Sequence, residues 1–143
     1  MNKRNIIRLI LISVLMACTG HNAFERSLSV ADSLMHEQPD SAYRLLCAME
    51  QDAARMPEAL QMRRLLLLSN AQNKAYKSFA SDSIGTLLTE YYDRNGKANE
   101  RMLAYYIKGC TYRDLGDQPA ALNCFNQAID AADTSLADCD FRQ

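Results

Sequence analysis

The chain has no tryptophan and only two histidines, His21 and His36, among its 143 residues. Its five cysteines include no C-x-x-C pair, so the sequence indicates neither a zinc site nor a thioredoxin-like redox motif. It also lacks H-E-x-x-H, a glycine-rich phosphate loop and G-x-S-x-G. Carboxylates such as Glu25 and Glu37 are expected on solvated helix faces. We therefore expect a protein that is not an enzyme and that uses neither a metal nor a cofactor.

No stretch of the chain alternates convincingly between apolar and polar residues, so no β-strand is expected. Its 16 Lys and Arg residues nearly balance its 17 Asp and Glu residues, and they form no basic patch. Nucleic-acid binding by this segment is therefore not expected, because such binding depends on clustered positive charge.

Residues 1–17 are typical of a targeting segment. Three positive charges within the first eight residues lead into an apolar run, LILISVLM at 9–16, far shorter than the roughly 20 residues that span a bilayer. The following Leu-Met-Ala-Cys at 15–18 resembles the lipobox of bacterial lipoproteins. That resemblance implies cleavage before Cys18 and a diacylglycerol on its thiol, with residues 18–23 as a lipidated tether.

An ordinary cleaved signal peptide with a chance cysteine is the alternative. A short amphipathic or buried helix fits less well, because the run is apolar all round. Cleavage would leave 126 residues, enough for one domain, and would lower the formal net charge from −1 to −4. Thr19, rather than aspartate, follows Cys18, which under the sorting rule of such lipoproteins implies the outer membrane. We expect a lipid-anchored protein of the bacterial cell envelope, periplasmic or at the outer membrane.

Four further cysteines are scattered over the expected helices. An exported chain could join them in disulfides, whereas free cysteines often serve as small apolar residues in helix packing. The packing role is favoured here, and the disulfide state stays open. The four are Cys47, Cys110, Cys124 and Cys139.

Apolar residues recur at helical spacing through most of the remaining chain. Pro39 suits the first turn of a helix, and Ser81-Asp82 suits an N-cap. Asn95-Gly96 would end a helix, with glycine in the left-handed conformation. The expected helices cover about 24–35, 39–51, 57–76, 83–95, 98–115 and 119–132, and residues 134–143 begin one more that is unfinished.

Two features predict that these helices form a repeat. The motif DSAYRLL at 40–46 is echoed 42 residues later by DSIGTLL at 82–88, and ALNCF at 121–125 follows at a further 37. Such an echo in a helical sequence is typical of an α-solenoid. The leucines at 65–68 are too many for one helical stripe, so some of them must meet a second helix or a partner, and packing within the chain is favoured.

Residues 102–135 resemble the tetratricopeptide repeat (TPR), with Met102 as the first position of the repeat. Small residues allow two helices to approach closely, and aromatic residues fill the next layer. Lys108 and Asp133 depart from the family, which usually has leucine and often proline there. A generic helical hairpin is the alternative. The matching residues are Tyr105, Gly109, Tyr112 and Gly116 on the first helix, and Ala121, Phe125 and Ala128 on the second.

The TPR resemblance implies an all-α fold in which antiparallel helical hairpins over residues 24–135 stack as a short α-solenoid. The first helix of each TPR lines a concave groove that binds proteins or peptides. Tyr106 and Arg113 are the favoured contacts, since both residue types are enriched at binding hot spots, although they could be ordinary surface or packing residues. The groove positions are Leu103, Tyr106, Cys110, Arg113 and Asp114.

The function expected from these features is a membrane-anchored scaffold or adaptor that binds a protein partner outside the cytoplasm. One alternative is the N-terminal sensory part of a longer membrane-bound signalling or transcriptional regulator, because residues 136–143 leave a helix without a partner or polar cap. Another is a glycan-binding surface lipoprotein, against which the lack of tryptophan and the short length argue.

Overall fold

The computed structural model describes residues 22–132, in which every regular element is helical. The all-α class is therefore confirmed for this part of the chain. The expected signal peptide, Cys18, Cys139 and the unfinished helix at 134–143 lie outside the described residues. A helical segment at 22–33 is followed by α2 (Pro39–Ala48), the 3₁₀-helix η1 (Met49–Arg55), α3 (Glu58–Lys74), α4 (Ser83–Asn95), α5 (Ala98–Asp114) and α6 (Gln118–Ala131).

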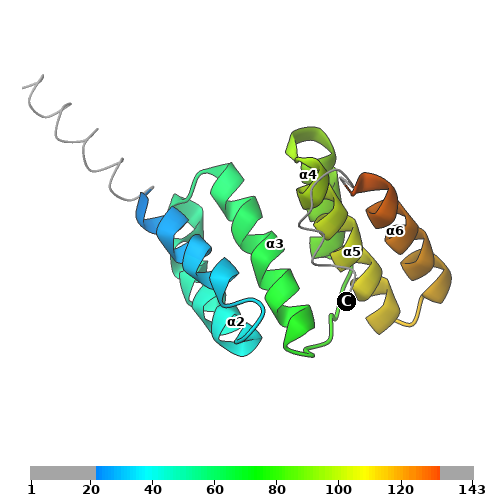
Figure 1. Cartoon of the computed structure of the whole chain (residues 1–143), viewed down its shortest axis with the longest axis horizontal. Helices are drawn as coiled ribbons and strands as arrows, with labels where there is room; N and C mark the ends of the chain where they lie inside the picture. Colours follow the sequence, from blue (N-terminus) through cyan, green and yellow to red (C-terminus); the bar gives the residue numbers. More distant parts are fainter. Residues whose placement is uncertain (1–21, 133–143) are drawn as a thin grey trace, which may run out of the picture.

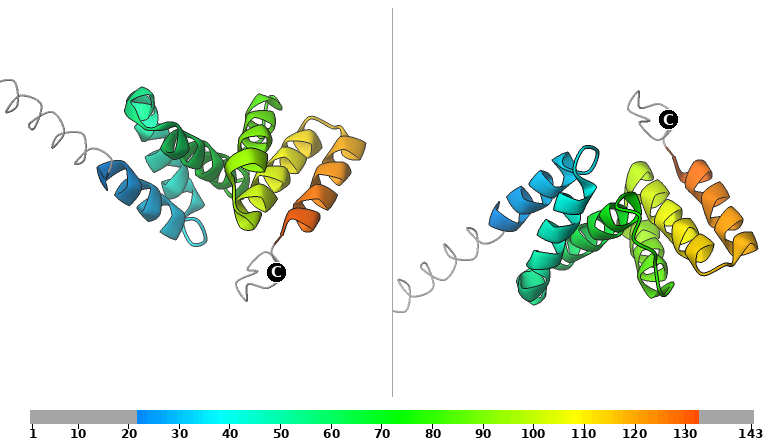
Figure 2. Two further views of the ribbon diagram at one scale, coloured as in Figure 1. Left: turned by 90° about the horizontal axis from the view of Figure 1, so that it is seen from above. Right: turned by 90° about the horizontal axis from the view of Figure 1, so that it is seen from below.

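The helices follow one another in chain order along the molecule, from the segment at 22–33 and α2 at one end to α6 at the other (Figure 1). Views from above and below show the same order (Figure 2). Helix α2 packs on α3, α4 packs on α5, and α5 has its most extensive contact with α6. Helix α3 also touches both α4 and α5, so it joins the two halves of the molecule.

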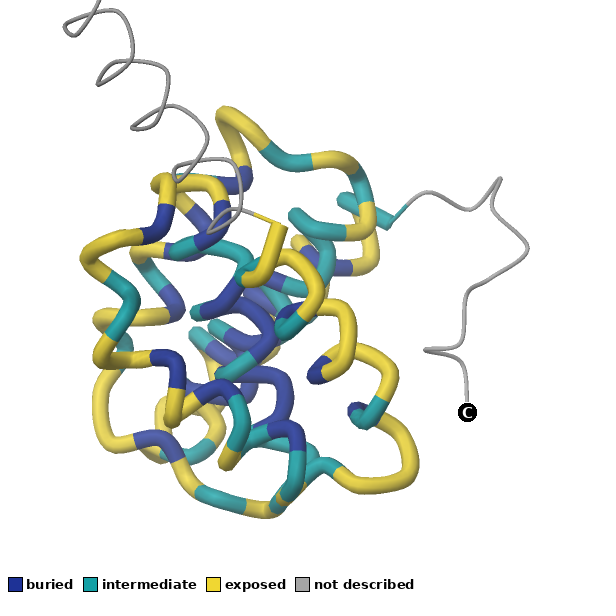
Figure 3. The backbone as a smooth tube through the Cα atoms, turned by 90° about the vertical axis from the view of Figure 1, so that its left-hand side faces the viewer, coloured by how far each residue is buried: buried dark blue, intermediate teal, exposed yellow. Residues whose placement is uncertain are grey.

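Two clusters of buried side chains both include residues of α3. In an end-on view the buried positions gather toward the centre of the molecule, between the helices (Figure 3). Leu67 belongs to the cluster formed with the segment at 22–33, α2 and η1, whereas Leu66 belongs to the cluster formed with α4 and α5. Leu65 packs against the second cluster and Leu68 against the first. The four leucines therefore serve two cores on two faces of one helix, and each fully buried leucine contributes about 1.5–3 kcal/mol.

Two expected boundaries at the N-terminal end were wrong. Residues 22 and 23 are already helical rather than part of a tether, and Ser27 Oγ donates to the Ala23 carbonyl at 3.2 Å. Helix α2 ends at Ala48 instead of near residue 51, and η1 continues the chain. The cause lies in α3, because Arg64 donates to the Leu46 carbonyl at 3.0 Å. In a continued α-helix that carbonyl would accept the N–H of residue 50.

Helix α4 has the expected limits, and the expected reason holds at its start but not at its end. Ser81 Oγ accepts the N–H of Ser83 at 3.2 Å, whereas the N-cap residue Asp82 makes no side-chain cap bond. Gly96 has a φ of −90°, so the left-handed conformation expected there is wrong. Glycine is required by close approach instead: a Cβ at Gly96 would lie 2.6 Å from the carbonyl oxygen of Tyr92.

The packing of small against large residues expected for 102–133 is present between α5 and α6. Gly109 lies directly against the ring of Phe125, since a Cβ at Gly109 would be 2.5 Å from two of its ring carbons. Ala121 and Ala128 of α6 are both buried. Asp117 caps α6 by accepting the N–H of Ala120 at 3.1 Å, which fixes the start of the helix.

Candidate functional site

An open hollow of about 570 Å³ lies where α3 and α5 end beside the turn that follows the segment at 22–33. Most of its lining is polar or aromatic, and it comes from segments that are far apart in the sequence. The main lining residues are His36 from the turn, Asn73, Lys74, Tyr76 and Lys77 from the end of α3 and the residues after it, and Tyr106, Arg113 and Asp114 from α5.

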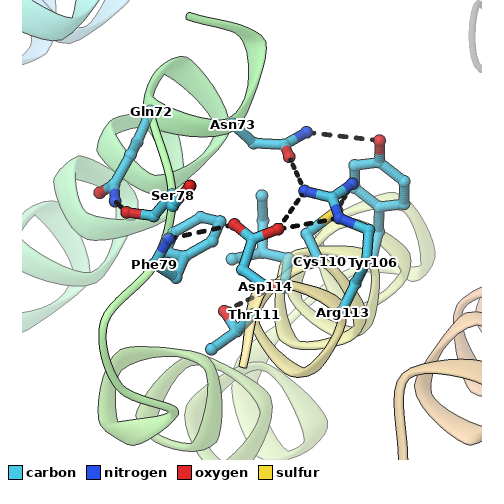
Figure 4. Close-up of polar contacts among 10 residues, drawn as sticks. Gln72, Asn73, Ser78, Phe79, Tyr106, Cys110, Thr111, Arg113 and Asp114 are labelled. Atoms are coloured by element: carbon cyan, nitrogen blue, oxygen red, sulfur yellow. Dashed lines mark hydrogen bonds and ion pairs between the residues drawn. The ribbon is translucent and has the colours of Figure 1, made fainter. Parts of the chain in front are cut away.

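Arg113 and Asp114 form the polar centre of the hollow (Figure 4). Arg113 pairs with the Asp114 carboxylate at 2.8 Å and donates to Asn73 Oδ1 of α3 at 3.2 Å. The hydrogen bond to Asp114 raises the pKa of the Arg113 guanidinium, so this side chain keeps its positive charge. Asn73 in turn donates to the Tyr106 hydroxyl at 3.4 Å. These bonds tie α5 to α3 and fix the orientation of the side chains that face the hollow.

Asp114 also fixes the loop between α3 and α4. Its second carboxylate oxygen accepts the backbone N–H of Phe79 at 3.1 Å. Phe79 is buried in the core cluster of α4 and α5, so the loop is held by an apolar and a polar contact. Asp114 therefore serves the fold, and little of its carboxylate remains for a ligand, because its side chain is only 13% exposed.

The five expected groove residues separate into two groups. Tyr106, Arg113 and Asp114 line the hollow. Leu103 is half-buried and packs against the core of α4 and α5. The place expected for Cys110 was wrong, because this residue is completely buried in that core and has no surface to offer a partner. Its burial raises the pKa of the thiol, as expected for a group removed from water.

Sequence reasoning missed the contribution of α3 and the loop after it. Lys77 pairs with Asp40 at 2.8 Å and lies 5.4 Å from the centre of the Tyr43 ring. The bond from Lys77 lowers the pKa of the Asp40 carboxyl. The ammonium of Lys74 has no hydrogen bond or ion pair within residues 22–132. The sequence held one signal of this contribution, the expected helix end near Tyr76. Antiparallel packing of the helices places that end beside the hollow.

The expected packing tyrosines lie on another side of α5, around a second hollow of about 370 Å³. Tyr105 donates to Asp93 at 2.7 Å, and this bond raises the pKa of its phenol to about 12. Tyr112 donates to Asp82 at 3.3 Å. Lys108, where the family usually has leucine, lies against Gly85 of α4: a Cβ at Gly85 would lie 3.1 Å from the Cα of Lys108, so the two helices pack closely there.

Within residues 22–132, Cys47, Cys110 and Cys124 are free thiols. The same residues hold no group of three or more His, Cys, Asp or Glu side chains that could bind a metal ion. No helix in the described part of the chain is long and apolar enough to cross a membrane.

Comparisons of the chain with protein-family models, with curated proteins and with solved structures found no match.

Proposed function

We propose that the chain is a TPR-like α-solenoid in which the segment at 22–33, α3 and α5 are the first helices of three successive hairpins. The contacts between neighbouring helices support this proposal. In the second and third hairpins, the first helix packs on the second helix of the preceding hairpin. Helix α3 packs on α2, and α5 packs on α4. The close packing of Gly109 against Phe125 within the third hairpin supports the same interpretation.

The proposed function is that of an adaptor that binds a protein partner in the hollow beside α3 and α5. One observation carries this proposal: an aromatic and an arginine side chain, Tyr106 and Arg113, are held in fixed orientations around an open hollow. Both residue types are enriched among the residues that dominate binding energies. The hollow is also lined by residues of two successive first helices, α3 and α5, and of the turns after the segment at 22–33 and after α3, which suits an extended segment of a partner.

Site-specific photocrosslinking in the native cells tests the adaptor function. A photoreactive amino acid at position 106 should capture a defined protein, whereas the same group at the exposed position 122 on α6 should not capture it. Equal capture from both positions, or none from position 106, contradicts the proposal.

The proposed location is the bacterial cell envelope, through a lipid on Cys18. The lipobox-like segment at 15–18 supports this part of the proposal. Labelling with palmitate should mark the wild-type chain and be lost in Cys18→Ala. Undiminished labelling of that variant would reject the anchor and leave the proposed binding function untouched.

A further inference from the structure

Helix α5 ends in a glycine-dependent turn. The N–H of Asp117 donates to the carbonyl of Tyr112 at 2.9 Å, and the N–H of Gly116 donates to that of Arg113 at 3.1 Å. This pair of bonds defines the Schellman motif, which needs one residue in the left-handed conformation. Gly116 has a φ of +84°, which glycine adopts without steric cost.

Helix α3 ends in the same motif without a glycine. The N–H of Lys77 donates to the carbonyl of Gln72 at 3.0 Å, and the N–H of Tyr76 donates to that of Asn73 at 3.0 Å. Tyr76 therefore takes the place that Gly116 has in α5, with a φ of +55°. In this conformation the Cβ of an L-residue is crowded against its own backbone, so a bulky side chain there is strained.

Apart from these two capping hydrogen bonds, nothing in the described part of the chain compensates that strain. The Tyr76 side chain is 97% exposed, so it buries no apolar area, and its hydroxyl makes no hydrogen bond within residues 22–132. It lies at the hollow, next to Lys74 and Lys77. Strained residues of this kind concentrate at active sites, ligand clamps and switch regions.

The charges around the hollow indicate what that ligand carries. Among residues 22–132, three cationic side chains, Lys74, Lys77 and Arg113, line the hollow, and Asp114 is the only carboxylate that does so. Asp114 is already engaged by Arg113 and by a backbone N–H, and Lys77 is paired with Asp40. The ammonium of Lys74 is left without a partner within residues 22–132, so a ligand that offers a carboxylate is complementary to the site.

We propose that Tyr76 and Lys74 form the contact that receives an acidic peptide segment of the partner, with an Asp or Glu carboxylate at Lys74 and the adjoining side chain against the Tyr76 ring. This inference rests on the adaptor function proposed above and specifies the chemistry of the partner. A peptide fits better than the surface of an anionic membrane, because the cations line a concave hollow that a flat bilayer does not enter.

The test uses residues 18–143 with Cys18→Ser. Peptides that bind this protein are selected from a random twelve-residue peptide library. The enriched peptides should be rich in Asp and Glu, and fluorescence anisotropy should show their affinity falling at least tenfold in Tyr76→Gly and in Lys74→Ser. Lys97→Ser is the matched control, since Lys97 is an exposed lysine away from the hollow, and it should bind like the wild type.

Thermal melting separates loss of contact from loss of fold. Tyr76→Gly removes the strain, so its melting temperature should equal or exceed that of the wild type although it binds peptide weakly. The reverse change, Gly116→Tyr, should lower the melting temperature, because a Cβ there meets no atom within 4 Å and only the backbone conformation opposes it.

Three results would overturn the inference and leave the adaptor function standing: a neutral or basic consensus, full affinity in Tyr76→Gly, or full affinity in Lys74→Ser. Anionic phospholipid vesicles are the second probe. If they bind the chain and this binding depends on Tyr76 and Lys74, the ligand is a membrane and the proposed acidic peptide is wrong. Enrichment of no peptide at all would count against the adaptor function itself, and the inference would fall with it.

Discussion

The contact between Gly109 and Phe125 leads to a quantitative prediction for Gly109→Ala. A Cβ at Gly109 would lie 2.5 Å from Cδ1 and Cε1 of Phe125 and 3.1 Å from its Cζ, so the ring must move. Overpacking of this kind costs about 1–3 kcal/mol, and alanine in a helix interior recovers about 1 kcal/mol relative to glycine. The net loss of stability is therefore expected to be small, at about 0–2 kcal/mol, and it needs an internal reference.

Gly85→Ala supplies that reference. Gly85 also lies within a helix, and its added Cβ would meet Lys108 at 3.1–3.3 Å, a milder contact than the one at Gly109. Gly85 lies in the first turn of α4 and Gly109 lies inside α5, so alanine gains less helix propensity at Gly85, and the difference between the two free energies of unfolding is a lower bound on the clash with Phe125. We expect Gly109→Ala to be less stable than Gly85→Ala by about 1–2 kcal/mol.

Guanidinium denaturation followed by circular dichroism measures this difference, and equal denaturant slopes are required for the comparison. Phe125→Leu in the Gly109→Ala background completes a double-mutant cycle. The double variant should be more stable than the sum of the single changes predicts, with a coupling of about 0.5–3 kcal/mol. Equal stability of Gly109→Ala and Gly85→Ala, or a coupling of zero, would refute the close approach of α5 and α6 at this point.

Arg64→Ala should lower the free energy of unfolding by about 2 kcal/mol in denaturant melts, because it leaves a buried carbonyl at the end of α2 without its donor; an effect near zero contradicts that role. Of the described thiols, exposed Cys47 should react with an aromatic disulfide reagent far faster at neutral pH than buried Cys110, and equal rates would contradict the burial. Tyr105, whose bond to Asp93 raises its pKa to about 12, should add stability below pH 10 that is lost between pH 10 and 12. Stability curves of the wild type and Tyr105→Phe should therefore converge over that range, and a constant difference would argue against the assignment.

Much of the fold followed from local signals in the sequence. Pro39 and Pro119 lie in the first turns of α2 and α6, where a missing N–H has no cost, and apolar residues at helical spacing give the helices between them. The leucines at 65–68 also indicated correctly that α3 meets more than one neighbour. These features depend on residues within one or two turns, which is why they can be read from the sequence.

Two errors arose where distant residues decide the local structure. The end of α2 depends on Arg64 of α3, and the burial of Cys110 depends on the way α5 packs against α3 and α4. Gly96 is a local error: the sequence indicated a helix end but not the crowding against Tyr92, only four residues earlier. The left-handed Tyr76 broke the usual rule for such positions, and no local pattern predicts an exception of that kind.

The candidate site shows why a single repeat could not reveal it. The TPR resemblance of residues 102–135 places Tyr106 and Arg113 on one helix, but their fixed orientations come from Asn73, 33 and 40 residues earlier. The faces of α5 are also divided: Ile107 and Cys110 are completely buried, whereas the Arg113 side chain is 47% exposed. Tyr106 and Asp114 serve both the hollow and the fold, because Tyr106 packs against the core cluster and Asp114 accepts the Phe79 N–H. Substitutions at the exposed Arg113 should therefore change binding more than stability, whereas those at Tyr106 and Asp114 should change both.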